Sequence, residues 1–283
     1  MIKSILAPSL GADTDGAVFA AALTLARDFG AHIDVLHVRL DPVVVAVGMT
    51  PDTSVGTITE GLITQLEQDA GAREARARQA FTEFCTREKL GGATAPDAPS
   101  VEWHVEVGQE ARWIAAYGMT ADLVVAARRD GDDANARSVL ETVLIESGRP
   151  LLIPPAGAPF TPPQRIAIAW KATAEAARAV AASLPFLVRA QQVSVWTVAE
   201  TAADNADADR LVRYLARHGV KTVAERLEPR ENGGAATLLA AARERADLLV
   251  MGGYGHSRFR EWVFGGFTQL ALAEAALPVL IVH

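Results

Sequence analysis

The chain has 283 residues, of which 50% are hydrophobic and 22% are charged, and its net charge is −7. This length suits two domains that each bury a core, and the acidic balance argues against a nucleic-acid partner or an anionic membrane surface. The single cysteine, Cys85, excludes an internal disulfide framework. We expect a cytoplasmic protein, because no apolar run is long enough for a bilayer and the N-terminal run is too short for a secretory signal.

Short runs rich in Val, Ile and Leu alternate along the chain with longer alanine-rich stretches of helical spacing. Such runs are typical of strands buried on both faces of a parallel sheet. In the first half we expect strands at 5–7, 33–38, 121–125 and 149–153, and in the second half at 167–169, 193–198, 246–250 and 277–281. Helical spacing is clearest at 17–29, 80–88, 174–187, 210–218 and 235–245.

The matched strands occur in the same order in both halves, which indicates an internal repeat. The sequence ADLVV at 121–125 recurs as ADLLV at 246–250, and RPLLI at 149–153 recurs as LPVLI at 277–281. Strands alternating with helices predict βαβ units. The expected fold class is α/β, with two tandem doubly wound domains, each a five-stranded parallel sheet flanked by about four helices.

A proline-rich stretch separates the two halves, because prolines at 154–155, 159 and 162–163 suit neither a helix nor a central strand. We place the first domain at 1–155, the linker at 156–163 and the second domain at 164–283. The first half is longer at 40–73, where several prolines and glycines precede a helical run from Ile58. We expect an extended arm or flap there.

A glycine-rich loop follows the fourth strand of the second half. Met251 leads into GGYGHSR at 252–258, and Gly265 and Gly266 precede a helix expected at about 268–276. Glycine lets backbone N–H groups approach a ligand closely, and a helix N-terminus offers free donors to phosphate. A doubly wound sheet also holds its ligand at the carboxyl ends of its strands. A single glycine is explained by a tight turn, but the ordered set favours phosphate binding.

This loop resembles that of the universal stress protein family. It is not a P-loop, because no Lys-Ser or Lys-Thr follows the glycines, and it lacks the Rossmann G-x-G-x-x-G spacing. Nucleotide-binding members of the family carry G-x2-G-x9-G-[S/T] after the fourth strand, and Gly252, Gly255 and Gly265 match that spacing. The resemblance covers each half once and implies that the second half holds ATP, ADP or AMP, alone or with Mg²⁺.

The resemblance also implies roles for individual residues. The ribose and phosphates would lie along Gly252 and Gly255, and the main chain at Val198 would meet the adenine. Met251 would line the pocket wall. The remaining candidates for contact with the phosphates are His256, Arg258, Gly265, Gly266, Phe267 and Thr268.

Two positions depart from the family pattern. Gly266 replaces the expected serine or threonine, which keeps the N–H and loses the hydroxyl. Trp170 and Lys171 follow the first strand where nucleotide-binding members usually have an aspartate against the adenine. For Trp170 and for Lys171, two interpretations stay open. Trp170 either packs against a base or fills its pocket, and Lys171 either pairs with phosphate or points to water.

The first half lacks the glycine pairs. Three acids, Asp130, Asp132 and Asp133, follow its fourth strand where phosphate would sit. Because like charges repel, we predict that this half has lost phosphate binding and that the chain binds one nucleotide.

The sequence offers no catalytic residue and no metal ligand set. His256 and Ser257 lack a third orienting group, and the other histidines show no metal-ligand spacing with Cys85 or with carboxylates. The family resemblance implies a stress-response sensor or regulator with an unknown regulatory partner. A nucleotide-free interaction scaffold and a slow ATPase of the adenine-nucleotide hydrolase-like group stay as alternatives. The apolar last strands, 151–154 and 279–282, predict pairing within the chain and into a homodimer.

Overall fold

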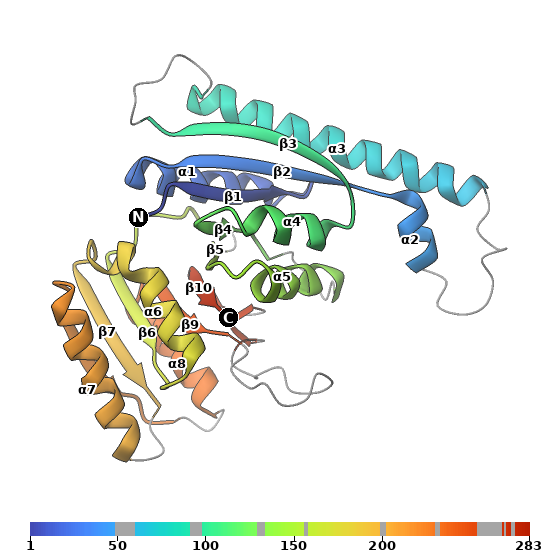
Figure 1. Ribbon diagram of the computed structural model, residues 1–283. Coiled ribbons are helices and arrows are strands. Elements are labelled where there is room, and N and C mark those ends of the chain that lie inside the picture. Colours follow the sequence, from blue (N-terminus) through green and yellow to red (C-terminus); the bar gives the residue numbers. More distant parts are fainter. Residues whose placement is uncertain are drawn as a thin grey trace. The chain divides into compact units, whose positions relative to one another are not determined.

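The computed structural model describes residues 1–48, 60–90, 98–128, 134–155, 158–198, 202–229, 233–253, 268, 270–272 and 275–283. They form two compact units, Ile2–Ser147 and Gly148–His283, the second together with Met1. Each unit is a sheet that carries helices (Figure 1).

The sheet of the unit Ile2–Ser147 contains parallel strands in the order β3-β2-β1-β4. These are β1 (Ser4–Ser9), β2 (His32–Leu40), β3 (Ser100–Gly108) and β4 (Leu123–Val125). The helices are α1 (Asp15–Phe29), α2 (Pro42–Gly48), α3 (Glu60–Glu88), α4 (Glu110–Gly118) and α5 (Ala134–Glu146). In Figure 1 the long α3 runs beside β2 and β3.

The unit Gly148–His283 orders its strands β5-β10-β9-β6-β7-β8. They are β5 (Leu151–Ile153), β6 (Arg165–Ala169), β7 (Gln192–Thr197), β8 (Thr222–Arg226), β9 (Leu248–Gly252) and β10 (Val279–Val282). Its helices include α6 (Ala174–Leu187), α7 (Ala202–Arg217) and α8 (Gly233–Arg245), and residue 268 and residues 270–272 are also helical. All the pairs are parallel except β5 with β10, which is antiparallel.

The predicted fold class is confirmed, because strands β1–β5 of the first repeat correspond in sequence to β6–β10 of the second. The strand β5 nevertheless belongs to the second compact unit, since Ile153 pairs with Val279 and Leu151 with Ile281. The last strands of the two repeats therefore pair, as their apolar sequences led us to expect. All their residues are buried.

An aspartate that recurs in both repeats, Asp122 and Asp247, forms the same backbone hydrogen bonds in each unit. Asp122 accepts hydrogen bonds from the backbone N–H groups of Lys3 (2.7 Å) and Ser4 (3.1 Å), and so holds the start of β1 beside β4. Asp247 accepts from the N–H groups of Gln164 (3.2 Å) and Arg165 (2.9 Å) at the start of β6. Burial acts to raise the pKa of the Asp247 carboxyl, but its bonds to Arg165 and Gln164 outweigh burial and hold that pKa below its ordinary value.

The insertion at 40–73 is helical where the structure describes it. It contains α2 and the first half of α3, which continues as one 29-residue helix to Glu88. Phe84 of α3 packs on Phe19 of α1, with ring centroids 5.3 Å apart. Cys85 lies half-buried on α3, and burial raises the pKa of its thiol, which fits a packing role. Neither α3 nor any other helix in the described ranges has the combination of length and apolar character needed to cross a membrane.

Candidate functional site

Three strands of the unit Gly148–His283 end side by side at one edge of its sheet. Ala169 at the end of β6 pairs with Trp196 on β7 and with Met251 on β9. The next residues along each strand include Trp170 and Gly252, and the N–H of Trp170 donates to the carbonyl of Trp196 (2.8 Å). In the strand order the chain continues from β6 to β7 on one side and from β9 to β10 on the other, so this is the switch point at which doubly wound folds hold ligands.

The first turn of α6 lies directly against Gly252. A Cβ at this position would stand 2.5 Å from the backbone nitrogen of Ala176 and 2.8 Å from the carbonyl carbon of Glu175. Thr173 caps the same turn by accepting a hydrogen bond from the N–H of Ala176 (3.3 Å). The glycine that opens the family motif is therefore required by helix–strand packing, independently of any ligand.

A cavity of about 390 Å³ opens beside Trp170, between α6 and α7. This volume falls within the range of small-molecule pockets. The indole Nε1 of Trp170 is buried and has no hydrogen-bond partner among the described residues. The lining is mainly apolar and includes Trp170, Ala177, Val180, Leu211 and Tyr214, with Arg210 at its side.

The structure describes six of the predicted site residues. Trp170 and Gly252 meet at the switch point, and Val198 follows β7 next to the start of α8, where a Cβ on Gly234 would lie 3.1 Å from Val198 Cγ1. Met251 is buried within β9, Thr268 is buried in a helical turn, and Lys171 is exposed. The other predicted residues, Gly255, His256, Arg258, Gly265, Gly266 and Phe267, lie outside the described residues.

Sequence reasoning predicted helices at 174–187 and 210–218, but it missed the cavity between α6 and α7 and the approach of Gly234 to Val198. A signal for the cavity is present in the sequence. Ala177 and Val180 on α6, like Leu211 and Tyr214 on α7, are spaced by three residues, which places each pair on one helix face.

The equivalent edge of the unit Ile2–Ser147 is built differently. Asp15 at the start of α1 accepts hydrogen bonds from the Ser9 hydroxyl (2.7 Å), the Leu10 N–H (2.8 Å) and the Gly11 N–H (2.9 Å). Gly11 has a φ of 63°, and a Cβ there would lie 2.4 Å from the carbonyl oxygen of Arg73 on α3. Helix α3 therefore covers the end of β1.

Arg73 completes this closure. Its Nε donates to the carbonyl of Leu10 (2.6 Å), and its guanidinium forms an ion pair with Glu110 at the start of α4. The side chains of Arg73 and Glu110 are only 15% and 7% exposed. A cavity of about 20 Å³ adjoins Leu10, Glu110 and Ala127. The acids Asp130, Asp132 and Asp133, from which we predicted the loss of phosphate binding, lie outside the described residues.

A buried histidine lies under the closed edge. The Nδ1 of His37 is 2.8 Å from the carbonyl oxygen of Ser9, and its ring stacks on Trp103 with centroids 6.1 Å apart. His37 Nε2 has no hydrogen-bond partner among the described residues. Burial lowers the pKa of His37 below that of a free imidazole.

The family model for universal stress proteins matches residues 1–153 and again residues 164–283. The chain belongs to the universal stress protein family. It is a tandem member, since the match occurs once in each half. No curated protein sequence matches this universal stress protein.

Two solved structures show the same fold as this universal stress protein. A universal stress protein from Archaeoglobus fulgidus DSM 4304 is 16% identical with a TM-score of 0.65, and the match covers 99% of this chain and 95% of that chain. A functionally unknown protein from Pseudomonas aeruginosa PAO1 is 15% identical with a TM-score of 0.57, and the match covers 99% of this chain and 92% of that chain. At such identities the likeness concerns the fold.

Proposed function

We propose that this universal stress protein binds one adenine nucleotide at the switch point of the unit Gly148–His283 and acts as a cytoplasmic sensor or regulator of the stress response. The observation that carries the proposal is the cavity of about 390 Å³ beside Trp170, at the strand edge from which the glycine motif begins. The base enters this cavity, and the phosphates lie on backbone N–H groups of the loop from Gly255 to Phe267. Family membership adds the motif spacing of Gly252, Gly255 and Gly265.

Trp170 takes over the base contact that an aspartate makes in other nucleotide-binding members. Its indole lines an apolar cavity, and stacking tolerates any aromatic base. Selection for adenine then rests on the main chain at Val198. Lys171 is exposed at the same edge, where its ammonium group can meet phosphate or water.

The described residues at this edge favour binding over catalysis. Glu175 lies in the first turn of α6 next to Gly252. Its own backbone N–H, the Thr173 hydroxyl and Arg178 all stabilise its ionised form, so the pKa of Glu175 is lowered. A carboxylate held in this way is a weak base at neutral pH. Ground-state binding of phosphate does not by itself lower the barrier to hydrolysis. We therefore expect ATP hydrolysis to be absent or slow, and any Mg²⁺ to bind only together with the nucleotide phosphates.

The test is calorimetric titration of the full chain with ATP, ADP and AMP, with and without Mg²⁺. We expect a stoichiometry near one. Gly255→Val should abolish binding because a branched side chain blocks the backbone donors, whereas Gly131→Val in the corresponding loop of the first half should leave it unchanged. A wild-type protein that binds none of the three nucleotides overturns the proposal.

Such a negative result would favour the nucleotide-free scaffold, which acts only through a partner protein or a second copy of the chain. One observation supports that alternative, namely that packing on α6 already explains Gly252. Steady-state phosphate release tests the remaining alternative, a slow ATPase. Turnover that disappears in Gly255→Val would identify the protein as an ATPase.

A further inference from the structure

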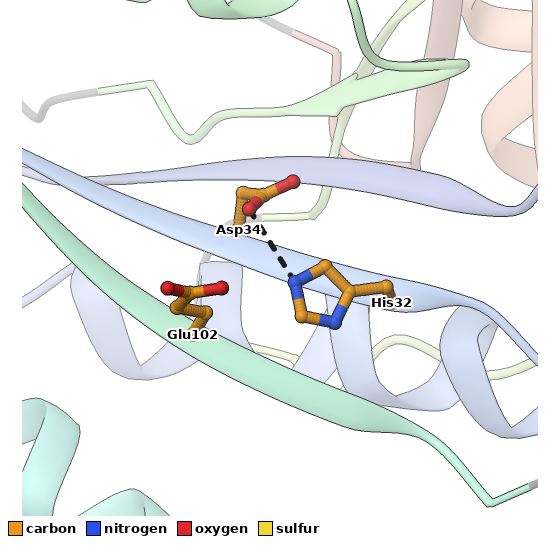
Figure 2. A group of neighbouring side chains, drawn as sticks. All are labelled: His32, Asp34 and Glu102. Atoms are coloured by element: carbon orange, nitrogen blue, oxygen red, sulfur yellow. Dashed lines mark ion pairs between the residues drawn. The ribbon is translucent and has the colours of Figure 1, made fainter.

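Three potential metal ligands gather on one face of the sheet in the unit Ile2–Ser147. His32 and Asp34 occupy alternate positions at the start of β2, so both side chains project from the same face. Asp34 pairs with Glu102 on the neighbouring strand β3, which brings a second carboxylate to that face. Figure 2 shows the ends of the three side chains turned toward one another.

The ligand atoms are close enough to share one ion. The nitrogen of His32 and one carboxylate oxygen each from Asp34 and Glu102 all lie within 4.8 Å of one another. His32 Nε2 and Asp34 Oδ1 are 3.4 Å apart. Zinc bonds of about 2.0–2.2 Å in a tetrahedral site place neighbouring ligand atoms roughly 3.3–3.6 Å apart. Glu102 is exposed on its strand, and its carboxylate oxygen lies no more than 4.8 Å from the other two ligand atoms.

Further polar groups hold two of these ligands in place. The Nδ1 of His32 is 2.7 Å from the Ser100 hydroxyl, which leaves Nε2 facing the carboxylates. His104 Nε2 is 2.9 Å from Asp34 Oδ1, and the Ser4 hydroxyl lies 3.4 Å from Asp34 Oδ2. Outer groups of this kind orient the ligands in known metal sites.

The charge of the cluster also calls for a cation. Two carboxylates lie together here, and among the described residues no lysine or arginine pairs with either of them. The ion pairs that Asp34 makes are with His32 and His104, and each depends on a protonated imidazole. A bound cation would compensate the charge of both carboxylates.

We propose that His32, Asp34 and Glu102 bind a divalent transition-metal ion, Zn²⁺, whose fourth position is left to water. A mixed nitrogen and oxygen set suits Zn²⁺, whereas Mg²⁺ and Ca²⁺ prefer oxygen alone. The ion ties β3, which ends the strand order of this unit, to β2, and His104 is a positioning residue for Asp34. The site belongs to a different unit from the proposed nucleotide site, so it does not depend on that proposal.

The experiment titrates the metal-free full chain with ZnCl₂ by calorimetry and follows thermal unfolding with and without Zn²⁺. The wild type should bind Zn²⁺ with a raised Tm, because a ligand of the native state stabilises it. Glu102→Gln and His32→Gln should each remove one bound ion and the Tm rise. His104→Gln should weaken binding about 10-fold to 100-fold, as expected for an outer partner of a ligand.

The matched control is His218→Gln, an exposed histidine directly after α7 of the other unit, and this variant should bind Zn²⁺ as the wild type does. Glu102 is exposed on its strand, so Glu102→Gln should leave the fold intact, which circular dichroism checks. The proposal is overturned if the wild type binds no Zn²⁺, or if Glu102→Gln and His32→Gln keep its stoichiometry and affinity.

Discussion

The carboxyl edges of β1 and β6 occupy the same position in the repeat, yet one is closed and the other is open. Arg73 and Glu110 form a buried ion pair against the end of β1. At the end of β6, Trp170 borders a cavity of about 390 Å³. In both units an aspartate, Asp122 or Asp247, holds the start of β1 or β6 by backbone hydrogen bonds. The frame of a duplicated domain can therefore persist while a neighbouring helix decides whether its edge is closed or borders a cavity.

Arg73→Ala breaks the closed edge and should have the largest effect. It leaves the Glu110 carboxylate buried without its partner and frees the carbonyl of Leu10, so the free energy of unfolding should fall by about 3–5 kcal/mol. Urea denaturation measures this loss. Arg27→Ala is the control, because Arg27 pairs with Glu88 in an exposed ion pair that contributes little to stability. Equal losses in the two variants would show that the edge is not held by this pair.

Gly252→Ala tests the close packing at the open edge. The added methyl group meets the backbone of α6, and overpacking of this kind should cost about 1–3 kcal/mol of unfolding free energy. The matched substitution Gly16→Ala on α1 has open space around its Cβ and should be neutral or stabilising by up to about 1 kcal/mol. If Gly252→Ala is as stable as Gly16→Ala, the glycine is there for the ligand and not for the helix.

Trp170→Ala decides between the two interpretations of the tryptophan. If Trp170 stacks on the base, its removal should weaken nucleotide binding by about 1–3 kcal/mol. If it only fills the pocket, the enlarged cavity should bind nucleotide as well as before or better. Calorimetry measures the nucleotide affinity of this variant. Trp113→Ala is the control, because Trp113 lies on α4 of the unit Ile2–Ser147.

His37 should make the stability of the unit Ile2–Ser147 decrease at acid pH. Because burial lowers its pKa in the folded state, the unfolded chain binds a proton first as the pH falls below about 6.5. Stability should therefore fall from pH 6.5 downward and level off below the lowered pKa. Urea denaturation at several pH values should show a weaker pH dependence for His37→Gln, whereas exposed His218→Gln should behave as the wild type does.

The fold could be predicted because its signals are local and repeated. The apolar runs at 121–125 and 246–250 became β4 and β9, and the aspartate that precedes each strand serves both units alike. The closure of the first edge could not be predicted, because Arg73 acts on Leu10 and Glu110 across 63 and 37 residues. Its effect depends on where α3 packs.

The proposed metal site shows the same limit of sequence reasoning. We expected no metal site from the spacing of the histidines, yet Asp34 meets Glu102 through the register of β2 and β3. A His-x-Asp pair at the start of a strand was the available local signal. The glycine motif begins at the end of β9, which the structure places beside the end of β6. The cavity beside Trp170 depends on how far apart α6 and α7 pack, which the spacing of residues on each helix does not determine.

The antiparallel pairing of β5 with β10 has a consequence for dissecting the protein. By repeat, β5 is the last strand of the first half, but its backbone covers one side of β10, whose four residues are all buried. A fragment that starts at residue 164 would leave a bare apolar edge from Val279 to Val282, and two such fragments would satisfy it by joining edge to edge. A fragment that starts at Gly148 includes β5, which pairs with β10 and covers this edge. The oligomeric state of an isolated second half would then report where the chain was cut and not how the intact protein assembles.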